Sequence, residues 1–340
     1  MRYCCLLILS LFLLTTKPVA QQATIDSIIT ETSVKQLVEW LAADSLMGRF
    51  TGSKGQEQAA DFIAREFRKA GLAPIAGYNG YFMPFSFPGP GQIRESKNVV
   101  GVLPGNSKSS ELILISAHYD HIGTLSTNPA KYVPENGRPE KGDTIYNGAN
   151  DNASGISAVI SMARYFGRIN NNERTLVFIA FSGEELGLIG SREMARTMDI
   201  QYVKAMINMD MIGVPAKKKN RYAYFTGSPL SNLRDILNNE LYNINPQQYG
   251  KQFFKRDPFL TEHLFTRSDN YWFALRGVAA HSILATPPNN RYYHSLNDEA
   301  GTLDYNLLAT ITKAIALSIT GLVNGTQTPS KLDIERINSF

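Results

Sequence analysis

Short apolar segments alternate with helical patterns along most of the chain. Apolar runs bounded by polar or turn residues predict strands at residues 98–103, 111–117, 175–181, 205–211 and 279–284. Apolar positions that recur every three or four residues predict helices at 34–41, 55–70, 155–166, 188–196, 230–242 and 305 to about 323. Strands and helices in alternation are typical of one α/β domain, in which helices cover both faces of a mainly parallel sheet.

Other segments predict turns and loops. Gly71 is expected to end the helix that precedes it. Residues 84–91 are rich in Pro and Gly and predict a surface connection, and the lysines at 217–219 predict the solvated tip of a hairpin. Residues 122–150 separate a strand from a helix without a periodic pattern, and loops of this length are generally functional. We therefore expect the 122–150 loop to contribute to function.

The first twenty residues have the three-part pattern of a secretory signal peptide. Arg2 precedes an apolar run at 4–14, and small residues around Ala20 offer a cleavage site. The run has 11 residues, fewer than the roughly 20 that cross a bilayer. We therefore expect that residues 1–20 are removed and that the mature domain comprises residues 21–340, with its folded core at about 30–325. We also expect a secreted or periplasmic location without stable membrane insertion.

Composition narrows the chemistry that the mature chain can perform. Hydrophobic residues make up 43% and charged residues 19%, a balance that excludes a disordered chain. Without the leader the chain has 32 basic and 30 acidic residues, so nothing indicates a nucleic-acid partner. Both cysteines, Cys4 and Cys5, lie in the leader. Disulfides, thiolate metal ligands and cysteine nucleophiles are therefore excluded from the mature protein.

Polar residues follow several of the predicted strands. The groups in question are His118-Tyr119-Asp120-His121, Asp151 at the start of a helix, Ser182-Gly183-Glu184-Glu185, Asp210, and His294 in a late loop. Asp151 alone has an ordinary structural explanation as a helix N-cap. Asp210 ends an apolar strand and has no such explanation, because an unpaired buried carboxylate costs several kcal/mol. Ligands bind at the carboxyl ends of strands in open α/β sheets, so we expect these groups to meet there.

A meeting of these groups would need bound cations. Five carboxylates would share one cleft, where like charges disfavour joint ionisation: Asp120, Asp151, Glu184, Glu185 and Asp210. Histidines and carboxylates without sulfur suit Zn²⁺, with Mn²⁺ or Co²⁺ possible. One carboxylate shared by two metal ions would leave room for a bridging water.

These motifs resemble the co-catalytic zinc aminopeptidases of metallopeptidase family twenty-eight, of the bacterial leucyl aminopeptidase type. The resemblance covers nearly the whole mature chain, from Gly48-Arg49-Phe50-Thr51-Gly52-Ser53 through Asn98-Val99-Val100-Gly101 to Tyr293-His294-Ser295-Leu296-Asn297-Asp298. It implies a single phosphorylase/hydrolase-like domain with a mixed, mainly parallel sheet. It also implies two Zn²⁺ ions and peptide substrates with a free N-terminus.

The resemblance implies a metal role for five residues. His118 and Asp210 would bind one zinc, Glu185 and His294 the other, and Asp151 would bridge the two ions. None of these roles follows from the spacing of the residues alone.

The resemblance also implies two catalytic residues. Asp120 would orient His118 by accepting the other imidazole N–H. Glu184 would act as general base, taking a proton from the metal-activated water and delivering it to the leaving amine. Five aromatic residues are candidates for the wall of an apolar side-chain pocket: Phe265, Trp272, Phe273, Tyr292 and Tyr293.

Two positions depart from the pattern of the family. Asn270 stands where relatives often have a histidine, which puts a substrate contact there in doubt, and Asn150 replaces a second aspartate. The 122–150 loop is longer than expected and, as a hypothesis, covers the cleft and restricts substrates to short peptides.

Three other functions stay open. A glutaminyl cyclase-like transferase is disfavoured by the complete ligand set, and a carboxypeptidase of the same fold differs only in which peptide end it binds. A non-catalytic binding protein is disfavoured because the proposed ligands and base are all present.

Overall fold

The computed structural model describes residues 24–89, 92–127, 142–216 and 222–340. The predicted leader, the lysines at 217–219 and the middle of the 122–150 loop lie outside these ranges, so those predictions remain predictions.

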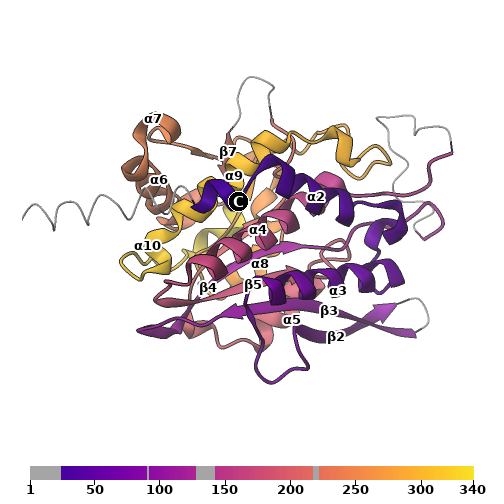
Figure 1. Ribbon diagram of the computed structural model, residues 1–340, viewed down its shortest axis with the longest axis horizontal. Coiled ribbons are helices and arrows are strands. Elements are labelled where there is room, and N and C mark those ends of the chain that lie inside the picture. The colour runs from indigo at the N-terminus through magenta and orange to yellow at the C-terminus, as the bar shows by residue number, and fades with distance from the viewer. Residues whose placement is uncertain (1–23, 90–91, 128–141, 217–221) are drawn as a thin grey trace, which may run out of the picture.

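Within the described ranges, one mixed sheet of nine strands forms the centre of the molecule (Figure 1). Its strands are β1 (Ala73–Pro74), β2 (Phe82–Gly89), β3 (Gln92–Leu103), β4 (Lys108–His118), β5 (Arg174–Phe181), β6 (Val203–Met209), β7 (Ala223–Phe225), β8 (Phe254–Arg256) and β9 (Ala280–Leu284). The order is β1-β3-β5-β4-β6-β9-β7-β8, and β2 pairs with β3 outside this path. The central strands β5, β4, β6 and β9 are parallel, whereas β1, β2 and β3 pair antiparallel. The predicted α/β fold with a mixed sheet is confirmed.

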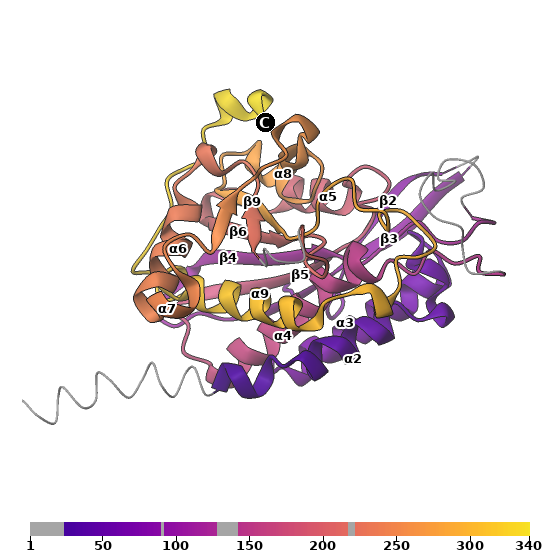
Figure 2. The same cartoon turned by 90° about the horizontal axis from the view of Figure 1, so that it is seen from above.

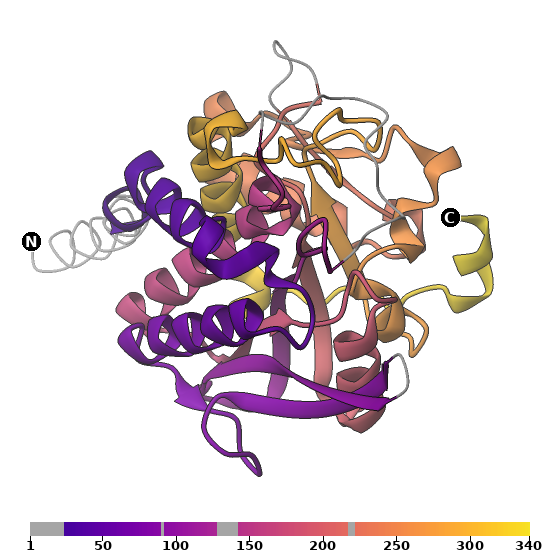
Figure 3. The ribbon, with the colours of Figure 1, turned by 90° about the vertical axis from the view of Figure 1, so that its right-hand side faces the viewer.

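Helices cover both faces of the sheet. They are α2 (Glu31–Leu41), α3 (Lys54–Lys69), α4 (Ser154–Ile169), α5 (Ile189–Thr197), α6 (Leu233–Ile244), α7 (Pro246–Tyr249), α8 (Asn270–Ala274), α9 (Tyr305–Ser318) and α10 (Thr320–Val323). Figure 2 shows α2, α3, α4 and α9 on one side of the sheet and α5 and α8 on the other. The helices α2 and α3, indigo in Figure 3, both contact α4, and Trp40 of α2 stacks on Phe62 of α3 with 3.8 Å between ring centroids.

The central strands bury both of their faces. All residues of β5 are buried, and alternate positions join different apolar clusters. Phe178 packs under α4, whereas Ile179 packs on the side of α5 and α8. Side chains of a strand point alternately to its two faces, so a strand covered on both sides reads as a continuous apolar run. This explains why these strands are visible in the sequence.

The last predicted helix belongs to the core. Tyr305–Val323 is long and apolar enough to cross a membrane, but 78% of its most apolar window is buried inside the protein. It divides into α9 and α10.

The prediction of a surface connection at 84–91 is wrong for its described residues. They belong to β2, which forms a long hairpin with β3, with Phe82 opposite Val99. Pro84 and Pro88 lack an N–H, and a strand at the edge of a sheet tolerates proline. Phe85 and Phe87 point inward and pack on Ile189. The prolines therefore obscured an alternating strand pattern.

Other local predictions agree with the structure. Gly71 has a φ of 80° and follows the end of α3, where a residue with a side chain would be strained. The short strands β1, β7 and β8 were not predicted, because two or three residues give too little pattern.

Substitution of Gly167 by alanine should destabilise the fold. A Cβ atom at this position in α4 would lie 1.9 Å from the carbonyl oxygen of Ala70. Alanine normally stabilises a helix relative to glycine by about 1 kcal/mol, but overpacking against a backbone typically costs about 1–3 kcal/mol. We expect Gly167→Ala to lower the free energy of unfolding in a denaturant titration. The control is Gly301→Ala, where no heavy atom lies within 4 Å of the added methyl. Equal stability of the two variants would contradict this packing.

Candidate metal centre

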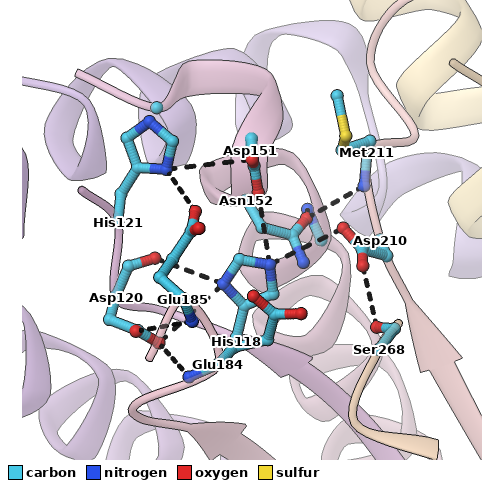
Figure 4. A network of polar contacts seen from close by, with 12 residues as sticks. His118, Asp120, His121, Asp151, Asn152, Glu184, Glu185, Asp210, Met211 and Ser268 are labelled. Atoms are coloured by element: carbon cyan, nitrogen blue, oxygen red, sulfur yellow. Dashed lines mark hydrogen bonds and ion pairs between the residues drawn. The ribbon is translucent and has the colours of Figure 1, made fainter. Parts of the chain in front are cut away.

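The predicted site residues meet at the carboxyl ends of the central strands (Figure 4). His118 ends β4, Glu184 and Glu185 follow β5, and Asp210 follows β6. Asp151 lies in the turn before α4, and His294 comes from the loop between β9 and α9. The expectation that these residues converge agrees with the structure.

The first of two clusters surrounds the imidazole of His118. Its Nε2 lies 3.2 Å from Oδ1 of Asp151 and 3.6 Å from Oδ1 of Asp210. On the other side of the ring, Nδ1 lies 3.2 Å from the backbone carbonyl of Asp120. A carbonyl oxygen only accepts hydrogen bonds, so Nδ1 carries a hydrogen and Nε2 is the nitrogen available to a metal.

The second cluster surrounds His294. Its Nε2 lies 2.9 Å from Oε2 of Glu185 and 3.2 Å from Oδ2 of Asp151. Asp151 therefore turns one carboxylate oxygen to each histidine. In each cluster the candidate ligand atoms lie within 4.8 Å of one another, so each could hold a metal ion. The donor set of imidazole nitrogens and carboxylate oxygens fits Zn²⁺ or a similar divalent cation.

Asp151 is not an N-cap, which was the simplest structural explanation for it. The helix α4 begins at Ser154 and has no side-chain cap. The carboxylate of Asp298 instead accepts hydrogen bonds from the backbone N–H groups of Asn150 and Asp151, at 2.9 and 3.0 Å. This contact holds the turn so that the side chain of Asp151 faces both clusters.

Asp120 holds the other ligand-bearing turn. Its carboxylate accepts hydrogen bonds from Thr51 Oγ1 at 2.8 Å and from the backbone N–H groups of Glu184 and Glu185, at 3.2 and 3.3 Å. The carboxylate oxygen Oδ1 of Asp120 lies 3.9 Å from His118 Nδ1. Asp120 therefore orients His118 through its backbone carbonyl, where the sequence led us to expect the carboxylate.

The buried cation Arg49 ties these turns together. Its guanidinium donates hydrogen bonds to the carbonyl oxygens of Tyr119, Asn147 and Gly148, at 2.7 to 2.9 Å, and also to that of Leu41. Burial lowers the pKa of Arg49 to about 10, so the side chain keeps its charge at neutral pH. That charge faces the carboxylates of the site and offsets part of their mutual repulsion.

The electrostatics of the centre favour bound positive charge. Burial disfavours the charged form of His118, but Glu184 and the contacts with Asp151 and Asp210 outweigh burial and raise the pKa of His118 well above its ordinary value. Burial opposes ionisation of Asp151 as well, yet the hydrogen bonds with His118 and His294 hold its pKa well below the ordinary value. The metal-free histidines thus keep protons where divalent cations would bind.

Glu184 differs from these ligand candidates. Burial and the charge of Glu185 raise the pKa of Glu184 well above its ordinary value. A carboxylate oxygen of Glu184 lies within 4.8 Å of a ring nitrogen of His118 and of a carboxylate oxygen of Glu185, and Glu184 lines the cavity beside the two clusters.

His121 belongs to the centre, although it was not among the predicted ligands. It is buried, its Nδ1 lies 2.8 Å from Oε1 of Glu185, and it forms one group with Asp151, Glu185 and His294. Its Nε2 has no hydrogen-bond partner among the described residues. In the sequence, the position of His121 three residues after His118 is the pattern that could have indicated this histidine as a site residue.

A small cavity of about 60 Å³ opens onto the metal centre. Its described lining is His118, Asp151, Glu184, Asp210, Met211, Tyr224, Leu264, Arg267, Ser268, Leu284, Thr286, Pro288, Tyr293 and His294. Of the five aromatic residues predicted for this wall, only Tyr293 contributes. Phe265 and Phe273 are buried in the apolar cluster with α5 and α8, and Trp272 faces Arg192. Tyr292 is not in the described lining.

The two positions that depart from the family pattern are both buried. The side chain of Asn270 donates to the carbonyl of Phe265 and accepts from Ser282, and it does not line the cavity. Asn150 accepts from the backbone N–H of Gly213 and donates to Thr286. Both asparagines thus brace the structure around the site.

The sequence matches a known protein family and several of its relatives. The model of "Peptidase family M28" matches residues 98–319. A "Probable leucine aminopeptidase" of Trichophyton verrucosum is 26% identical over 310 residues, which cover 85% of this chain and 73% of that protein. A "Probable zinc metalloprotease" of Pyricularia oryzae is 31% identical over 192 residues, or 53% of this chain and 34% of that protein.

The matched segments are short relative to several of these relatives. They span 22%, 34%, 24% and 38% of four fungal proteins, each named "Probable zinc metalloprotease".

Solved structures share the fold. The aminopeptidase from Aneurinibacillus sp. strain AM-1 has a TM-score of 0.64 at 14% identity, with 92% of this chain and 97% of that chain covered. Porphyromonas gingivalis glutaminyl cyclase has a TM-score of 0.66 at 15% identity, with 86% and 99% covered. These likenesses show the fold alone. Because the family model covers well over half of the sequence, including every predicted metal ligand, the chain belongs to peptidase family M28.

Proposed function

We propose that this protein is a secreted di-zinc aminopeptidase that removes N-terminal residues from peptides. The observation that carries this proposal is the carboxylate of Asp151, which faces His118 with one oxygen and His294 with the other. The pattern of a signal peptide at residues 1–20 supports secretion.

The ligand set would divide between two zinc ions. His118 and Asp210 would hold one ion, Glu185 and His294 the other, and Asp151 would bridge them. When bound, the two ions would lower the pKa of a water molecule towards about 7 and polarise the carbonyl of the scissile bond. Asp120 and Asp298 accept hydrogen bonds from backbone N–H groups, and these hydrogen bonds hold the ligand-bearing turns in place.

Glu184 would move the proton. It lies in the cavity wall next to the ligands, and the hydrogen bond from its backbone N–H to Asp120 fixes its position. Burial and the charge of Glu185 raise its pKa, which makes the ionised carboxylate a stronger base. It would accept a proton from the attacking water and then donate it to the leaving amine.

The size of the cavity supports an exopeptidase. The cavity of about 60 Å³ lies directly beside the candidate ligands, which supports a site that receives one end of a peptide. The carboxylates of the centre complement the positive charge of a free N-terminus. The structural likeness to a glutaminyl cyclase keeps that transferase as the second candidate.

A substrate panel separates these functions. We expect the purified protein to hydrolyse aminoacyl anilides, a metal chelator to abolish this activity, and Zn²⁺ to restore it, because the histidines and carboxylates act only through bound metal. A spectrophotometric assay of anilide release measures the rate. Peptides with N-terminal glutamine and C-terminally blocked peptides serve as comparisons. Release of ammonia from the glutamine peptides without amino-acid release, or cleavage only where a C-terminal carboxylate is free, would contradict the aminopeptidase assignment.

Replacement of the general base should slow the reaction without loss of metal. We expect Glu184→Gln to reduce turnover by at least about a hundredfold, in line with general-base contributions of about 10²–10⁴. Zinc content measured by elemental analysis should equal that of the unmodified protein, because Glu184 is not among the proposed ligands. The matched control is Glu193→Gln, a substitution on α5 at the surface. Undiminished turnover of Glu184→Gln would remove this residue from its assigned role.

A further inference from the structure

The cavity has an apolar wall and, among its described lining residues, a single arginine. Met211, Leu264, Leu284 and Pro288 supply apolar surface to its lining. Among the described lining residues, Arg267 is the only lysine or arginine. The positive charge of Arg267 repels divalent cations and so cannot contribute to their binding. The presence of this arginine in the cavity wall therefore needs another explanation.

Arg267 lies close to the second histidine cluster. Its Nη2 donates a hydrogen bond to the hydroxyl of Tyr293 at 3.3 Å. The ring of Tyr293 stacks on the imidazole of His294, with centroids 3.9 Å apart and planes at 21°. The guanidinium is thus separated from a proposed zinc ligand by a single aromatic ring.

The charge of Arg267 is not neutralised within the described part of the chain. No carboxylate there lies within 4.0 Å of its guanidinium, whereas Arg49, the other arginine near the centre, faces Asp120 and Asp298. Arg267 is exposed, so its side chain is accessible to an incoming molecule. A planar guanidinium matches a carboxylate with two parallel hydrogen bonds.

We propose that Arg267 is a specificity-determining residue that binds a carboxylate of the substrate, an inference that rests on the proposed peptidase function. The carboxylates of the metal centre would repel an anionic substrate, and Arg267 supplies an attractive charge at the cavity. Two parts of a substrate carry the required group. One is the C-terminal carboxylate of a dipeptide, and the other is the side chain of an N-terminal Asp or Glu.

Two matched substrate pairs distinguish these sources. Leucyl-leucine and leucyl-leucine amide differ only in the C-terminal carboxylate. Glutamyl and glutaminyl anilides differ only in the charge of the N-terminal side chain. In each pair the measured quantity is the ratio of kcat/KM for the carboxylate substrate to kcat/KM for the neutral one.

We expect the unmodified enzyme to prefer the carboxylate member of one pair, and that pair identifies the source. Arg267→Met keeps the aliphatic stem but removes the charge, and it should lower this ratio by about ten- to a hundredfold, mainly through KM. Arg267→Lys should restore part of the ratio, because lysine keeps the charge without the two-pronged geometry. The control Arg196→Met, at an exposed position on α5, should leave the ratio unchanged.

A purely structural role for Arg267 predicts a different result. If Arg267 served only to hold Tyr293, then Tyr293→Phe, which removes their hydrogen bond, would lower the ratio as much as Arg267→Met does. That result would overturn the proposal, as would a ratio near one in both pairs or a ratio that Arg267→Met does not change. In all these cases the neutral substrates would still be hydrolysed, and the peptidase function would stand. Absence of hydrolysis of every substrate would instead reject the proposed function together with this inference.

Discussion

Buried carboxylates that accept backbone N–H groups hold the two turns on which the metal centre depends. Asp298 fixes the turn that carries Asp151, and Asp120 fixes the turn that carries Glu184 and Glu185. A buried carboxylate without such partners would cost several kcal/mol. The hydrogen bonds offset that cost and, at the same time, place the neighbouring side chains. The buried charge of Arg49 lies between these elements and offsets repulsion among the acids.

The parts of the fold that could be predicted are those with a continuous local pattern. The inner parts of β4, β5 and β6, at 113–118, 174–181 and 205–209, are buried on both faces and therefore read as mainly apolar runs. Residues that follow such strands share one edge of the sheet, which is why His118, Glu185 and Asp210 could be expected to meet. The strand β2 escaped prediction because its prolines are tolerated at an edge position.

The parts of the site that could not be predicted depend on long-range contacts. The backbone carbonyl of Asp120, and not its carboxylate, lies against His118, and a residue type alone does not distinguish the two. Arg49 contacts Asn147 and Gly148, about a hundred positions along the chain, so no local pattern indicates the contact. The cavity wall likewise combines side chains from several separate loops. Most of the aromatic residues expected there pack in the core.

The central claim is that one carboxylate bridges two metal ions. Diffraction from zinc-soaked crystals, recorded above and below the zinc absorption edge, tests it directly by locating each ion through its anomalous signal. The account predicts two peaks about 3.5–4 Å apart, one beside His118 and Asp210, the other beside His294 and Glu185, with Asp151 in contact with both. A single peak, or two peaks that Asp151 does not join, would contradict it.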